Sequence, residues 1–323
     1  MMKGAGSTPI TCSLLNIKYI ISGSAVESEL NSDEFYLAYQ KNDNVLSLGF
    51  MVKSDIKNYV FEDSPFDNQD NLLCAMTGED IQCFERIGMQ MDVVSGVYAK
   101  NDNATYLLHE DGIKGQARFD FEAENDGRPL YVYFQQDRYV DATNGANIPS
   151  IETNDITLTL ENMIVNPELV PARIIQIGTD KKNKYKFSII LPENLEADYY
   201  NKAFFCYYDE SEFLKAYELL KRNQLKVTEC KDGYVKGIIE AENDGIMFTS
   251  IPYDSGWTIM VDGKKVETVP LLDNAFLGVE LEKGKHDVEM DYEPSGKKEG
   301  ITISCIALMI TLTAYAILNL LRR

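Results

Sequence analysis

The sequence is poor in the residues and spacings that mark metal and nucleophile sites. Its 323 residues include only two histidines and one tryptophan. No two cysteines are spaced as CxxC, so neither a zinc knuckle nor a thioredoxin-like centre is supported. No GxSxG elbow, EF-hand loop or glycine-rich phosphate loop occurs. His109 stands alone in a polar turn, and one histidine without a partner makes no metal site. We therefore expect no metal, no cofactor and no catalytic residue here.

Basic side chains are also scarce. The chain has 31 Lys and Arg against 51 Asp and Glu, giving a formal net charge of −20. Phosphate binding needs a basic face, so a nucleic-acid partner is excluded. An acidic surface also resists association, and this keeps the protein soluble.

Six cysteines are scattered through a chain that is large enough to need no disulfides. We expect isolated, mostly buried thiols, and a bridge between Cys74 and Cys83 stays open as an alternative. The six are Cys12, Cys74, Cys83, Cys206, Cys230 and Cys305.

Only one long apolar run is present. Residues 300–321 are predicted to form a transmembrane helix, whose apolar core Ile301–Leu321 carries no charge. At helical rise this core spans roughly 30 Å, the thickness of the hydrocarbon layer. Its Ser and Thr hydroxyls can bond to the helix backbone and so do not oppose insertion. The lipid bilayer is thus an expected partner. The alternative, a buried core helix, fits poorly because the run is apolar on all faces.

The orientation in the membrane is not fixed by local charge. Lys297 and Lys298 precede the run and Arg322 and Arg323 follow it, so the count is equal at both ends. Residues 1–24 contain no signal-peptide h-region. Two readings follow: the chain is the C-terminal piece of a longer exported protein, or it is tail-anchored with its bulk in the cytoplasm.

Residues 1–90 are predicted to form a small α/β module. Residues 14–22 look like a buried strand. Two further apolar runs, 35–39 and 45–52, are separated by a polar turn. A helix is predicted from Pro65, with Ser64 as its N-cap and Gly78 just past its end.

Residues 91–296 are predicted to form a β-sandwich-like domain with one helical insertion, which makes the whole fold mainly β (α+β). The helix is capped by Asp209 or Ser211 and buries Phe213 and Leu220 on one face. Short alternating segments cut by turn residues are typical of a sandwich. These segments are Ala117–Ala123, Leu130–Gln135, Ile156–Leu160, Ala172–Ile177 and Tyr185–Leu191.

The last soluble stretch has the clearest strand pattern. Residues 257–261 alternate and are followed by Asp262-Gly263, a strong hairpin signal. Residues 277–281 form another strand. His286, Val288, Met290 and Tyr292 then share one face, on which we expect His286 to serve packing. The opposite face carries Asp287, Glu289 and Asp291, a solvated stripe rather than a calcium site because the carboxylates are spread too widely.

Two aromatic residues are the candidate ligand contacts. Tyr253 and Trp257 flank a turn and could stack on the apolar face of a sugar. Trp257 also begins an alternating strand, so the alternative is that it anchors the core.

Several short segments, in order, resemble the C-terminal half of the YfhO family of bacterial membrane proteins. The series IPYDxGW…VDGK…GxH is fairly specific, and the resemblance covers essentially the whole chain. The segments are Leu15–Ser22, Leu48–Val52, Pro65–Gln69, Ile251–Trp257, Val261–Lys264 and Gly284–His286, followed by the membrane helix.

The resemblance implies a function that the residues alone do not. Members of this family look like GT-C-type glycosyltransferases with many membrane spans, an outward-facing domain and a last span. They are thought to move a sugar from a polyprenyl-phosphate carrier onto cell-envelope glycopolymers such as lipoteichoic acid. Their catalytic acid lies in the multi-span part, so none is carried over here. By the same resemblance the bulk is extracytoplasmic, Arg322 and Arg323 are cytoplasmic, and upstream spans of the same protein are partners.

Three hypotheses follow. The first is that the chain is the accessory, acceptor-facing part of such an enzyme in the bacterial plasma membrane. The second is a membrane-anchored, non-catalytic β-sandwich that binds glycan or protein. The third is an inactive truncated fragment.

Overall fold

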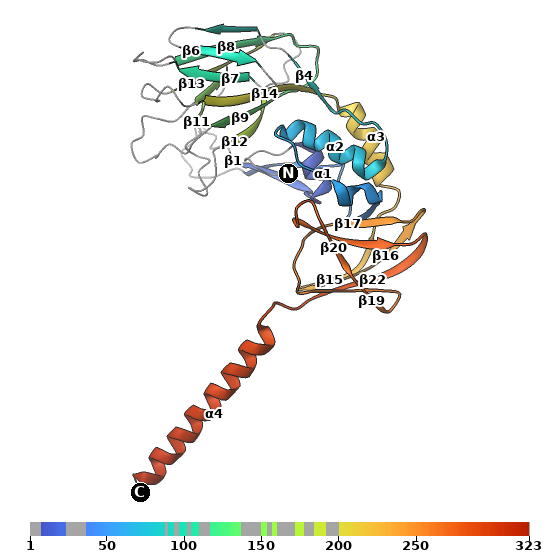
Figure 1. Ribbon diagram of the computed structural model, residues 1–323, viewed down its shortest axis with the longest axis vertical. Coiled ribbons are helices and arrows are strands. Elements are labelled where there is room, and N and C mark those ends of the chain that lie inside the picture. The colour runs from blue at the N-terminus through green and yellow to red at the C-terminus, as the bar shows by residue number, and fades with distance from the viewer. Residues whose placement is uncertain are drawn as a thin grey trace. The chain divides into compact units, whose positions relative to one another are not determined.

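The structure, a computed structural model, is mostly β with antiparallel sheets, as the sequence predicted. It divides into two compact units (Figure 1). The N-terminal unit comprises Met1–Val45 and Asn58–Leu219, and the C-terminal unit comprises Leu46–Lys57 and Leu220–Arg323. The structure describes residues 8–23, 37–87, 90–93, 97–101, 105–109, 117–136, 150–153, 157–159, 172–177, 184–191 and 200–322.

The N-terminal unit contains a two-stranded ribbon and two larger sheets. The strands β1 (Tyr19–Gly23) and β2 (Leu37–Lys41) form the ribbon. One sheet has the order β11 (Thr157–Thr159), β10 (Ser150–Thr153), β13 (Tyr185–Leu191), β8 (Ala117–Ala123) and β5 (Gln90–Val93). The other has the order β12 (Ala172–Ile177), β9 (Leu130–Gln136), β14 (Tyr200–Tyr208), β7 (Thr105–His109) and β6 (Val97–Asn101), with β4 (Phe84–Arg86) paired to β14.

All five short segments predicted between residues 117 and 191 are strands. They are β8, β9, β11, β12 and β13, with bounds that differ from the prediction by no more than a residue. The predicted helix is confirmed as α3 (Glu210–Leu220). The Asp209 carboxylate accepts the backbone N–H of Ser211 at 2.8 Å, so Asp209 is the cap. The face toward the core buries Phe213, Ala216, Tyr217 and Leu220.

Two helices begin with the same signal, a hydroxyl side chain followed by proline, and only the second is among the predicted elements. Helix α2 (Pro65–Thr77) has Ser64 as N-cap and Gly78 at φ 76° after its end, as predicted. Residues 9–14 form α1 (Pro9–Leu14), capped by Thr8, which accepts the N–H of Thr11. The strand predicted from residue 14 therefore begins only at Tyr19. It is not buried there, because Tyr19 is 56% exposed.

An aromatic cluster lies where α2 meets the sheet that contains β4, β9 and β14. Phe84 lies 4.8 Å from Phe66 of α2, 5.8 Å from Tyr131 of β9 and 5.3 Å from Tyr208 of β14, measured between ring centroids. The buried carboxylate of Asp70 accepts the backbone N–H of Phe84 at 3.0 Å. Burial raises the pKa of Asp70 to about 7, against the opposing effect of its backbone hydrogen bonds. Phe84 thus connects α2 to the sheet. Its ring is held by aromatic contacts, and its backbone is held by the hydrogen bond to Asp70.

The C-terminal unit is a sandwich of two sheets. One has the order β15 (Lys226–Lys231), β16 (Tyr234–Ala241), β22 (Gly284–Tyr292), β18 (Trp257–Val261) and β19 (Lys264–Val266). The other has the order β20 (Thr268–Leu271), β21 (Phe276–Leu281), β17 (Gly245–Pro252) and β3 (Gly49–Val52), and a short 3₁₀ helix, η1 (Ser54–Asn58), follows β3. Their inward side chains share one core, which includes Met247, Ile259, Leu277, Val288 and Met290.

The predicted hairpin and the predicted alternation of β22 are both confirmed. Asp262 and Gly263 have φ values of 51° and 76°, the two positive angles that a type I′ turn requires. Val288 and Met290 are fully buried, whereas Asp287 is exposed. Two strands of the first 90 residues pair with distant partners: β3 with β17, and β4 with β14. Separate folding of residues 1–90, and of 91–296, stays a prediction.

Helix α4 (Lys297–Leu321) is the candidate membrane span. It is the one helix within the described residues that is long and apolar enough to cross a bilayer, and none of its side chains is buried. The hydroxyls of Thr302, Thr311 and Thr313 each donate to the backbone carbonyl four residues earlier, at 2.8 Å. These three hydroxyl groups are thereby satisfied within the helix itself.

No disulfide joins the six cysteines, all of which lie in described parts of the chain. The alternative bridge between Cys74 and Cys83 is not formed: the Cys74 thiol donates instead to the carbonyl of Ile81 at 3.4 Å. Cys12, Cys83 and Cys206 are buried, whereas Cys230 and Cys305 are exposed.

Candidate functional site

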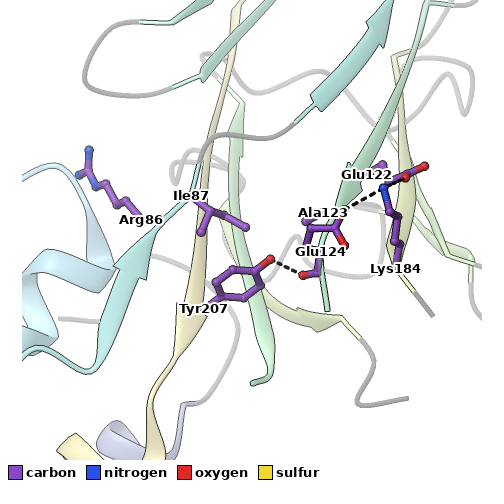
Figure 2. Close-up of a pocket in the computed structure, with 7 residues that line it drawn as sticks. All are labelled: Arg86, Ile87, Glu122, Ala123, Glu124, Lys184 and Tyr207. Carbon is purple, nitrogen blue, oxygen red and sulfur yellow. Dashed lines mark hydrogen bonds and ion pairs between the residues drawn. The ribbon is translucent and has the colours of Figure 1, made fainter. Parts of the chain in front are cut away.

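An open pocket of about 460 Å³ lies in the N-terminal unit, where the ends of several strands meet. Its walls come from β4, the end of β8, the residue before β13, and β14. Figure 2 shows Lys184 and Tyr207 approaching the end of β8 from two sides. The lining residues are Arg86, Ile87, Glu122, Ala123, Glu124, Lys184 and Tyr207.

Lys184 joins the two carboxylates of the pocket. Its ammonium lies 2.7 Å from Glu122 Oε1 and 2.8 Å from Glu124 Oε1. These hydrogen bonds raise the pKa of Lys184, so it stays charged at any physiological pH. Because the groups are solvent-exposed, the pairs contribute little to stability. Their effect is to hold two carboxylates at a fixed place on the pocket wall.

Tyr207 forms a rigid side of the pocket. Its hydroxyl donates to the backbone carbonyl of Glu124. Burial raises the pKa of Tyr207, so the phenol remains a neutral donor. The guanidinium of Arg128 stacks on its ring, 4.9 Å from the centroid, and pairs with Glu85 at 2.6 Å. The hydroxyl of Tyr185 donates to the Arg128 carbonyl at 2.6 Å, so β13 and β14 are linked beside the pocket.

The charges of the pocket suit a neutral, hydroxyl-rich ligand better than an anion. Arg86 is paired with Asp67 and its guanidinium lies 4.8 Å from the centroid of the Phe204 ring. Lys184 is likewise paired with Glu122 and Glu124. Both basic side chains of the pocket therefore already form ion pairs with carboxylates of the protein. A carboxylate has about four acceptor positions, so the exposed Glu124 can accept further hydrogen bonds beside the one from Lys184. Hydroxyl groups, which donate to carboxylates, match that arrangement.

The aromatic residues singled out from the sequence lie in the C-terminal unit, not at this pocket. Trp257 contacts Tyr292, with ring centroids 5.0 Å apart and planes tilted by 45°. Tyr253 and Trp257 are both partly buried and pack against the core of the sandwich. A glycan contact at these two residues stays a prediction. No sequence motif marks this pocket, because its residues come from four distant segments of the chain.

The described residues contain no group of three or more His, Cys, Asp or Glu side chains close enough to hold a metal ion. In the acidic stripe of β22, Glu289 pairs with Lys236 of the neighbouring strand. Asp287 and Asp291 are exposed.

His286 makes polar contacts in addition to lying on the inward-facing side of β22. Its Nδ1 lies 2.8 Å from Asp262 Oδ2, and its Nε2 lies 2.9 Å from the carbonyl oxygen of Glu282. A neutral imidazole has only one N–H donor, whereas the imidazolium has two and satisfies both oxygens. The hydrogen bond to Asp262 is the main cause that raises the pKa of His286. The ring therefore ties the β18–β19 turn to β22.

Raising the pH from about 6 to about 9 is expected to destabilise the C-terminal unit through His286. The folded-state pKa lies above the unfolded value of about 6.5. The stabilisation is therefore complete below that value and is lost as the pH rises through the folded pKa. Urea unfolding followed by Trp257 fluorescence at several pH values measures the slope. In Asp262→Asn this part of the slope should disappear, and an unchanged slope would contradict the assignment.

A mostly β soluble part joined to one apolar helix of membrane-spanning length defines a membrane-anchored protein. A family model described as "Bacterial membrane protein YfhO" matches residues 1–304, and the chain belongs to that family. It is also similar to "Uncharacterized protein YfhO" of Bacillus subtilis (strain 168), with 31% identity over 67 residues. That match covers 21% of this chain and 8% of the Bacillus protein, so the chain corresponds to a small part of this relative's length.

Proposed function

We propose that this chain is the extracytoplasmic, acceptor-facing part of a polytopic GT-C-like glycosyltransferase in the bacterial plasma membrane. Such an enzyme takes a sugar from a polyprenyl-phosphate carrier and adds it to a cell-envelope glycopolymer of the lipoteichoic acid type. Upstream spans of the same protein supply the donor site and the catalytic acid. Family membership and the ordered resemblance of the segments support this proposal.

The observation that carries the acceptor role is the open pocket with its paired carboxylates. The acceptor atoms of such a glycopolymer are hydroxyl groups, which donate to carboxylate oxygens, whereas its anionic phosphates would lie outside the pocket. The exposed Glu124 presents such oxygens beside Lys184, which also pairs with Glu122, so the charges of the pocket are locally balanced. A contact of this kind positions a chain without reacting with it, so its loss should weaken acceptor binding more than the chemical step.

The double substitution Glu122→Gln with Glu124→Gln is expected to raise the KM for acceptor about tenfold and leave kcat nearly unchanged, because hydrogen bonds to charged acceptors are the stronger ones. The assay uses the full-length protein, with its upstream spans, in membrane vesicles that contain labelled polyprenyl-phosphate sugar. Lys184 keeps its exposure to water, so the fold should survive. Glu79→Gln, at an exposed glutamate outside the pocket, is the matched control.

Unchanged sugar transfer in the double variant, with the fold verified by circular dichroism, would argue against the acceptor role of the pocket. A second candidate function is a non-catalytic module that binds glycan. Tyr253 and Trp257, both partly exposed on one turn, favour it. Glycan binding by this chain without its upstream spans, lost in Trp257→Ala, would point to that module.

A further inference from the structure

One corner of the C-terminal unit is hydrogen-bonded directly to the segment that leads from β22 into α4. The backbone N–H of Glu293, just past β22, donates to the carbonyl of Gly256 at 3.1 Å. Trp257 begins β18 opposite Tyr292, the last residue of β22, and the two rings are in contact. We call Ser255, Gly256, Trp257 and Tyr292 the aromatic corner.

The connection from this corner to α4 is a tight turn and not an extended arm. The N–H of Lys297 donates to the carbonyl of Pro294 at 3.2 Å, closing a four-residue turn. The ammonium of Lys298, in the first turn of α4, lies 2.8 Å from Glu293 Oε2. The end of β22 is therefore held beside the first turn of the membrane helix.

The depth of the aromatic corner follows from this connection. The apolar run begins at Ile301, one helical turn or about 6 Å beyond Lys297. The polar first turn thus coincides with the headgroup layer, which is roughly 5–8 Å thick on each side of the hydrocarbon core. A group hydrogen-bonded to Glu293 lies at or next to that layer, whichever side of the membrane the unit occupies.

The residue types of the corner match that position. Trp and Tyr are enriched at the membrane–water interface, because their rings are apolar and their N–H or O–H groups need polar partners. Trp257 and Tyr292 are only partly buried by the protein. The other end of the same sheet, with Asp262 and His286, lies about 20 Å further along β22 and bears polar, charged groups.

We propose that the aromatic corner contacts the lipid headgroup layer of the bilayer that α4 crosses, and that Trp257 and Tyr292 anchor the C-terminal unit to this surface. The partner is the lipid surface itself. The inference depends on α4 spanning the membrane and is independent of the proposed transferase function and its pocket.

The single tryptophan of the sequence makes the test direct. The full chain is reconstituted into phosphatidylcholine vesicles that carry a spin label either on the headgroup or at position 12 of the acyl chain. Trp257 emission is expected to be quenched at least twofold more by the headgroup label than by the acyl-chain label. The control is Trp257→Phe with Lys264→Trp, which moves the fluorophore to the exposed turn at the other end of the sheet.

Two results would overturn the proposal. One is headgroup quenching of Trp257 no greater than that of the control tryptophan. The other is a change in Trp257 emission on adding soluble glycan to the chain in detergent, without headgroup quenching in vesicles. That result would assign the corner to glycan binding. Near-ultraviolet circular dichroism of both proteins verifies that the comparison is between folded chains.

Discussion

Replacing Phe84 by alanine is expected to lower the free energy of unfolding of the N-terminal unit by about 4 kcal/mol. The ring is 2% exposed and touches three other aromatic rings, from α2, β9 and β14. Its backbone is held by Asp70, so the chain cannot easily move into the space that is left. A cavity therefore remains, and the loss of contacts adds to the loss of buried apolar area.

The readout for Phe84→Ala is the labelling of the Cys206 thiol in increasing urea. Cys206 is fully buried in β14, so its labelling reports the opening of this unit. The control is Phe61→Ala. Phe61 is only partly buried and meets Tyr59 edge to face at 5.1 Å, so its removal should cost about 1 kcal/mol. Equal shifts in the two variants would mean that Phe84 does not link the helix to the sheet.

Gly256→Ala is expected to destabilise the C-terminal unit by about 3 kcal/mol, because the structure has no room for a methyl group there. A Cβ at this position would lie 2.5 Å from the carbonyl oxygen of Glu293 and 2.9 Å from the ring of Tyr292. The first of these contacts is with backbone, which cannot rotate away. Relief would require moving Gly256 away from the end of β22 and breaking the hydrogen bond between Gly256 and Glu293.

Urea unfolding of the full chain in detergent, followed by Trp257 fluorescence, measures the effect of Gly256→Ala. Gly300→Ala is the matched control, because nothing lies within 4 Å of the added methyl group and the residue is helical. This change should be neutral or slightly stabilising. A Gly256 variant as stable as the Gly300 variant would show that the close approach is not required.

The features that were predictable from the sequence are those that neighbouring residues determine. Ser64, Pro65 and Gly78 specify both ends of α2 by capping and by backbone conformation. Asp262-Gly263 specifies its hairpin in the same way, since few residue pairs tolerate two positive φ angles. Thr8-Pro9 carries the same helix-start signal as Ser64-Pro65. The strand expected after it begins at Tyr19, five residues later than predicted, because α1 extends to Leu14.

The features that were not predictable are contacts between distant segments. Strand β3 near residue 50 pairs with β17 near residue 250, and no local sequence pattern in either strand identifies the other as its partner. The pocket combines Arg86, Glu124, Lys184 and Tyr207 in the same way. Lys184 and the two glutamates resemble ordinary surface charges until the pairing of β8 with β13 brings them together. The membership of a strand in a sheet is a global property, and local patterning does not determine it.

Strand β22 leads into the membrane helix, and it is also an interior strand of its sheet. It pairs with β16 along eight residues on one side and with β18 along five on the other. A load applied along the axis of β22 would act on a strand that is hydrogen-bonded on both edges. Such a load must shear both ladders at once, instead of peeling one hydrogen bond at a time. Helix α4 is thus attached to the C-terminal unit through the central strand of a five-stranded sheet, where tension along the strand would be shared between two ladders of hydrogen bonds.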